Sequence, residues 1–117
     1  DTDVPTGQGF AKSVKLDCTT ADASLAAAEV AALEYKMEGQ DLQYIKKGTS
    51  NAESLTLTFW VKTNKTGTYV VTWYDNDNDR QTSQNYTVSV ADTWEKKNHH
   101  FSMKICKTIF LDVKGIV

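Results

Sequence analysis

The sequence has little of what marks several classes of protein. Its 117 residues include one proline, six glycines and two cysteines. Cys18 and Cys106 lie far apart and have none of the spacing of metal-binding or redox motifs. Two free, partly buried thiols are therefore favoured over a disulfide. No phosphate-binding loop or nucleophile motif occurs either, so we expect no cofactor.

Positive charge and long apolar runs are also scarce. The formal net charge is −2, and no run of Lys and Arg is longer than two residues, so the chain lacks the basic patch of a nucleic-acid-binding protein. No apolar run approaches the ~20 residues that span a bilayer. The start lacks both Met and an apolar leader. We expect a segment of a longer protein, with no nucleic acid and no membrane among its partners.

What is present is the composition of one globular domain, with 40% hydrophobic and 24% charged residues. Residues 1–9 are polar and turn-rich, and they predict an entry linker. Residues 10–117 are then expected to form a single domain. Its first strand is predicted at Phe10 to Cys18, where Val14 and Leu16 alternate with polar residues.

Residues 22–37 satisfy two patterns. Their alanines favour a helix that Gly39 would end. A period of two over Val30 to Met37 favours a strand instead. In the segment that follows, Leu42 and Ile45 are three residues apart, which predicts one short helical turn packed on a sheet edge.

The stretch from Leu55 to Arg80 predicts a β-hairpin, because two alternating runs flank a polar loop. A turn at Thr63 to Gly67 would give one apolar face with the pairs Val61 with Tyr69, Phe59 with Val71, and Leu57 with Trp73. The opposite, more polar face would pair Trp60 with Val70, Thr58 with Thr72, and Thr56 with Tyr74. Trp73 and Trp94 are expected in the core. Further short strands at NYTVSV and from DTWEKK onward predict an all-β fold, an antiparallel β-sandwich.

Five segments form a distinctive set: EGQDL, KKGT, LTLTFWVKTNKTGTY, YTVS and DTWEKK. The set resembles a module of phage virion structural proteins, especially tail-fibre-like proteins of marine phages. That module is similar to the jelly-roll carbohydrate-binding modules attached to many glycoside hydrolases. The resemblance covers about residues 1–97. It implies a jelly roll, a strand at Val30 to Met37, no catalysis, and a place in the virion, which is extracellular after release.

Residues 98–117 depart from this family pattern, so the last strands of the jelly roll are in question. The segment still alternates between apolar and mostly polar residues, and it predicts one or two strands. The apolar positions are Phe101, Met103, Ile105, Ile109, Leu111 and Val113.

Trp60 and Tyr74, with Thr58 and Thr72 between them, are the candidate carbohydrate-binding residues. Aromatic faces stack on sugar rings, and hydroxyl groups bond to sugar hydroxyls. The expected partner is a glycan of the host surface. In the alternative interpretation sister chains, for example of a homotrimer, cover these residues, and the domain is a structural spacer. A polysaccharide-cleaving enzyme would need paired carboxylates in a cleft, which no motif provides.

Two clusters invite interpretation as metal sites. The segment DNDNDR places Asp75, Asp77 and Asp79 at alternate positions, as in calcium loops, but the glycine and the later glutamate of an EF-hand are missing. Turn chemistry accounts for these residues without a metal. His99 and His100 are adjacent, and adjacent residues of a strand point to opposite faces. No metal site is expected.

Overall fold

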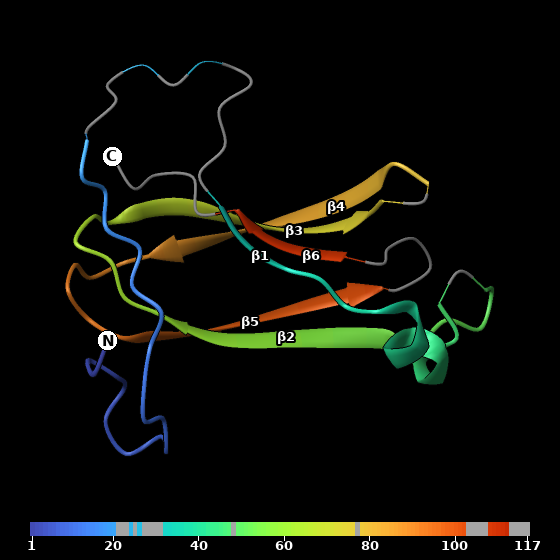
Figure 1. The fold of residues 1–117 in the computed structure, drawn as a ribbon, viewed down its shortest axis with the longest axis horizontal. Helices are drawn as coiled ribbons and strands as arrows, with labels where there is room; N and C mark the ends of the chain where they lie inside the picture. Colours follow the sequence, from blue (N-terminus) through green and yellow to red (C-terminus); the bar gives the residue numbers. More distant parts are fainter. Residues whose placement is uncertain are drawn as a thin grey trace.

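A computed structural model shows a chain built mostly of strands (Figure 1). The structure describes residues 1–20, 24, 26, 32–47, 49–76, 78–102 and, for the backbone alone, 108–112. Within these residues the elements in chain order are β1 (Ala32–Tyr35), the 3-10 helix η1 (Gly39–Ile45), β2 (Ser54–Val61), β3 (Gly67–Asp75), β4 (Arg80–Val88), β5 (Glu95–Ser102) and β6 (Thr108–Asp112). The predicted all-β class is confirmed.

The strands form two antiparallel sheets. One is four-stranded, in the order β1-β6-β3-β4, and the other joins β2 to β5. In Figure 1 the β2 and β5 pair lies below the larger sheet, and η1 lies at one end of both. The strand β6 lies between β1 and β3. The segment after residue 97 therefore supplies most of β5 and all of β6, which confirms the strands predicted there.

The apolar core combines side chains from both sheets. The residues buried in it are Tyr69, Val71 and Trp73 of β3, Tyr86 and Val88 of β4, and Phe101 of β5. Partly buried side chains of β2 pack against them, namely Leu55, Leu57, Phe59 and Val61. The predicted core position of Trp73, which is 1% exposed, is confirmed. The jelly-roll topology stays a prediction.

The predicted hairpin of β2 with β3 is wrong. The partner of β2 is β5, and β3 pairs with β4 and β6. Leu57, for example, lies opposite His99 and not opposite Trp73. The apolar faces of the two runs do meet, but across the core, from different sheets. A period of two describes a strand with one buried face, and it is the same whether the apolar partner lies beside the strand or across from it.

The predicted strand at Phe10 to Cys18 is not formed, although the structure describes all of these residues. Val14 is 71% exposed and Leu16 is 45% exposed, so this alternation buries no apolar face. Cys18 is free and exposed, not partly buried. Cys106 lies outside the described residues.

Two other local predictions are confirmed. Ala32 to Tyr35 form the strand β1, so the strand is correct there and the helix is not. The strand ends before Lys36 and Met37, two residues earlier than predicted, and residues 30 and 31 lie outside the described part. The short helical turn is η1, in which Leu42 is 3% exposed and Ile45 packs against the core. Within the part of the chain that the structure describes, no helix has the length and apolar character that crossing a membrane requires.

Candidate functional site

The outer face of the two-stranded sheet is a polar surface that contains one tryptophan. Because side chains alternate along a strand, every second residue of β2 and β5 points away from the core. The cross-strand pairs on this side are Ser54 with Ser102, Thr56 with His100, Thr58 with Asn98, and Trp60 with Lys96. We call these eight residues the Trp60 face.

Hydrogen bonds between the strands order the side chains of this face. The Thr58 hydroxyl donates to the Asn98 amide oxygen at 2.8 Å. The Thr56 hydroxyl lies 3.1 Å from Nδ1 of His100. Trp60 is partly exposed beside these groups. The bond from Thr58 uses the carbonyl of Asn98, so the amide NH₂ of Asn98 can donate to a ligand.

The four predicted carbohydrate-binding residues do not lie together. Trp60 and Thr58 are on the Trp60 face, whereas Tyr74 and Thr72 point outward from the larger sheet, on the far side of the core. This separation follows from the wrong hairpin register. The cross-strand partners of Trp60 and Thr58 are instead Lys96 and Asn98, from the segment EKKNHHFS. Every second residue of this segment points outward and is polar, and this pattern could have indicated the polar face from the sequence.

Tyr74 and Thr72 are engaged with neighbours of their own sheet. The Tyr74 hydroxyl donates to Oδ1 of Asp79 at 2.8 Å, and this bond raises the pKa of Tyr74. The hydroxyls of Thr72 and Ser83 lie 2.8 Å apart. The hydroxyls of Thr72 and Tyr74 are thus bonded to neighbours in their own sheet, and this second outer face has no tryptophan among the paired residues of β3 and β4 that point outward.

The two histidines point to opposite faces of β5, as predicted. His100 is exposed on the Trp60 face, while His99 points inward, with its Nδ1 3.1 Å from Oε1 of Gln84. The ring of His99 stacks on Phe59, with centroids 5.9 Å apart. Burial lowers the pKa of His99, and the charge of Lys97 lowers it further. Adjacent in sequence, the two rings are on opposite sides of β5 and cannot share an ion.

Glu95, at the start of β5, holds the preceding loop in place. Its Oε1 accepts the backbone N–H groups of Ser89 and Val90 at 2.8 and 2.9 Å. Its Oε2 accepts a bond from Nζ of Lys97 at 2.6 Å. The Lys97 bond and the two backbone bonds lower the pKa of Glu95 to about 2. The carboxylate therefore stays ionised at neutral pH, and its role is to hold the loop before β5 in place.

The aspartates of DNDNDR have different neighbours. Asp75 is buried and forms an ion pair with Nζ of Lys47 at 3.1 Å. Asp79 accepts the bond from Tyr74, and Asp77 lies outside the described residues. Among the residues that the structure does describe, no group of three or more His, Cys, Asp or Glu side chains could hold a metal ion.

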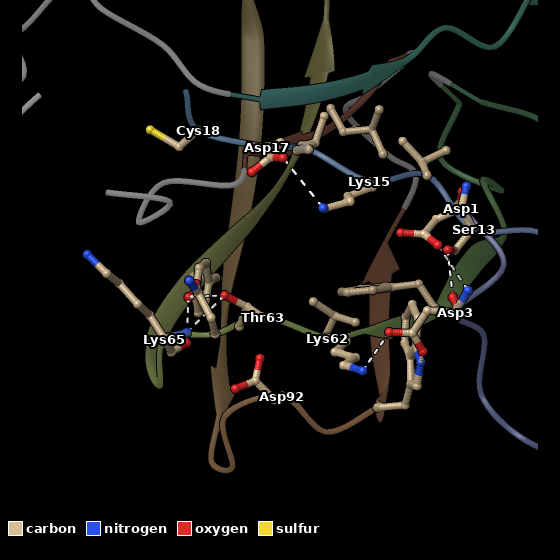
Figure 2. Close-up of a pocket in the computed structure, with 18 of the residues that line it drawn as sticks. Asp1, Asp3, Ser13, Lys15, Asp17, Cys18, Lys62, Thr63, Lys65 and Asp92 are labelled. Atoms are coloured by element: carbon tan, nitrogen blue, oxygen red, sulfur yellow. Dashed lines mark hydrogen bonds and ion pairs between the residues drawn. The ribbon is translucent and has the colours of Figure 1, made fainter. Parts of the chain in front are cut away.

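A cleft of about 720 Å³ opens at the end of the core, between residues 13–18 and the loop after β2 (Figure 2). The carboxylate of Asp3 joins its rim by bonds from Lys62 at 2.5 Å and from the indole N–H of Trp94 at 3.0 Å. These two bonds, that of Lys62 first, lower the pKa of Asp3. Trp94 is thus half-buried at the rim, and its predicted place in the core is wrong.

Several of the groups that line the cleft are paired with each other or buried. Lys15 and Asp17 form an ion pair with each other at 3.4 Å, and Figure 2 shows this pair on the side of the cleft away from Lys62. The tyrosines of its floor, Tyr69 and Tyr86, are only 2% and 6% exposed. Residues 1–9 have no strand or helix, but the bonds of Asp3 attach them to the domain. Two residues of this N-terminal segment, Asp1 and Asp3, form part of the wall of the cleft.

Comparison of the chain with protein-family models, with curated proteins and with solved structures finds no match in any of the three. The Trp60 face combines a partly exposed indole with exposed hydroxyl and amide groups on two paired strands.

Proposed function

We propose that this domain is a non-catalytic carbohydrate-binding module of the jelly-roll type. It would belong to a phage tail-fibre-like structural protein and recognise a glycan of the host surface. The Trp60 face supports the binding role, because a partly exposed indole lies among hydroxyl and amide groups on paired strands. The set of segments from EGQDL to DTWEKK supports the phage assignment.

The chemistry of a sugar ring matches this arrangement. One face of the ring presents C–H groups that stack on an aromatic side chain, and its edge carries hydroxyls that need donors and acceptors. Trp60 would supply the stacking surface, while Thr58 and Asn98, joined at 2.8 Å, would bond to the edge. Strands hold such groups more rigidly than loops do.

A binding role without catalysis fits the charges of the face. Glycoside hydrolysis uses two carboxyl groups on either side of the scissile bond, and none of the eight residues of the Trp60 face is Asp or Glu. One indole on an open face gives weak binding per domain. Several copies on one fibre would raise the overall affinity, because linked sites act at a high effective concentration.

The test is calorimetric titration of the domain with polysaccharide fractions from host surfaces. Trp60→Ala should weaken binding about tenfold, the equivalent of ~1.4 kcal/mol. Tyr74→Ala is the matched control, because it removes an aromatic ring from the other outer face, and it should leave binding unchanged. Far-UV circular dichroism of both variants checks the fold. Binding that depends on Tyr74 and not on Trp60, or no binding at millimolar ligand, would refute the proposal.

One observation favours a second candidate, the structural spacer. Neither β2 nor β5 has another strand beside it among the described residues, and unpaired strand edges invite pairing with another chain. In that case strands of sister chains would pair with these edges, and the chains brought together in this way would pack over the Trp60 face. Sedimentation would then show a trimer that Trp60→Lys dissociates, whereas the glycan-binding role predicts the same mass for the parent and the variant.

A further inference from the structure

Among its eight residues, the Trp60 face carries one lysine and no acid. We infer that its ligand is an anionic glycan, one that carries carboxylate or sulfate groups, and that Lys96 selects it. This inference rests on the proposed function and adds the class of sugar to it.

The position of Lys96 is the first support. Lys96 is the cross-strand partner of Trp60, and such partners have Cβ atoms about 4.5–5.5 Å apart. A sugar ring stacked on the indole would therefore bring its substituents within reach of the ammonium group. An acidic substituent would gain a charge-assisted bond there, which is stronger than a bond between neutral groups.

The availability of Lys96 is the second support. Six other lysines form ion pairs with carboxylates of this chain, and they are Lys15, Lys36, Lys46, Lys47, Lys62 and Lys97. Lys96 is exposed, and within the described part of the chain no carboxylate is paired with it. Its charge is thus available to a ligand.

The charge of the surroundings is the third support. The chain has a formal net charge of −2, so its surface as a whole repels polyanions weakly. A cationic spot beside the one aromatic ring of the face would direct an acidic chain to that spot. The neighbouring groups of Thr58 and Asn98 are neutral and add no competing carboxylate.

The experiment compares the same polysaccharide with and without its charges. Polygalacturonate and its full methyl ester form one pair, and dextran sulfate and dextran form the other. Calorimetry of the parent domain should show about five- to tenfold tighter binding of the acidic member of one pair, and the pair that responds identifies carboxylate or sulfate. The preference should shrink as the salt concentration rises, because salt screens exposed charges.

The variant Lys96→Gln should remove this preference and keep the residual binding of the neutral member. Lys12→Gln is the matched control, since it removes the same charge from an exposed lysine of the N-terminal segment, and it should keep the preference.

Equal binding of acidic and neutral members, or a preference that survives in Lys96→Gln, would overturn the inference and leave the proposed function standing. No binding of any of the four polysaccharides, with the fold intact, would count against both.

Discussion

In the four-stranded sheet, β3 and β4 bury five apolar side chains, whereas β5 of the two-stranded sheet turns Glu95, Lys97 and His99 inward beside a single buried residue, Phe101. The larger sheet thus contributes most of the core. The smaller sheet contacts the larger one through the partly buried apolar side chains of β2. It also bonds to β4, where Nζ of Lys97 donates to the Thr87 carbonyl and Nδ1 of His99 lies 3.1 Å from Oε1 of Gln84. We infer that the larger sheet provides most of the stability of the domain, and that residues on the outer face of the smaller sheet can change with little loss of stability.

The largest effect expected from this difference concerns two tryptophans. Trp73→Ala removes a side chain that is 1% exposed and should lower the free energy of unfolding by about 4 kcal/mol, because it leaves a cavity in the core. Trp60→Ala, on the outer face, should cost less than about 1.5 kcal/mol. Urea unfolding followed by circular dichroism measures both. Equal costs would mean that the Trp60 face is buried in solution.

The next effect concerns the buried ion pair at the end of β3. The side chains of Lys47 and Asp75 are 9% and 2% exposed. Lys47→Met leaves the Asp75 carboxylate without that cation and should cost about 3 kcal/mol. Replacing both residues, Lys47→Met with Asp75→Leu, should recover most of that loss. A double variant as unstable as the single one would show that Asp75 is needed for its other contacts, such as the bond from Asn78.

A smaller effect concerns Glu95 and pH. Its pKa is about 2 in the folded protein, against an ordinary 4.5. Because the folded pKa is the lower one, the stabilisation is complete above pH 4.5 and is lost as the pH falls from there towards 2. Glu95→Gln should therefore flatten the dependence of unfolding free energy on pH in this window. Glu53 forms an exposed ion pair with Lys46, and Glu53→Gln is the control, which should leave the pH dependence unchanged.

The pH dependence of the unfolding free energy also tests how the smaller sheet is stabilised. If Glu95→Gln leaves the pH dependence intact, the bonds of Glu95 to the preceding loop and to Lys97 contribute nothing to the stability of the smaller sheet. Apolar contacts of Leu55, Leu57 and Phe59 would then be what fixes it to the larger one.

The faces of the strands could be predicted from the sequence, and the neighbours of the strands could not. Alternation correctly assigned Phe59, Val71 and Trp73 to an apolar face. It could not tell whether Phe59 lies beside Val71 in one sheet or across the core from it, because both arrangements have a period of two. The candidate site depended on that choice, so Trp60 and Tyr74 were placed together although the core separates them.

Long-range contacts explain the other differences. Trp94 lies at the rim of the cleft because its indole bonds to Asp3, 91 residues earlier, and no local pattern reports such a partner. Val14 and Leu16 alternate as strand residues do, but they find no apolar surface to cover them. The strand β1 formed despite helix-favouring alanines, since pairing with β6 outweighs local propensity.

The most direct measurement is a map of amide chemical shifts by NMR while a host-surface polysaccharide is added. If the Trp60 face binds the glycan, the shifts that change with saturation will be those of Trp60, Lys96, Asn98 and His100, and those of Thr72 and Tyr74 will stay fixed. Saturable changes centred on Thr72 and Tyr74, with Trp60 unaffected, would contradict the account.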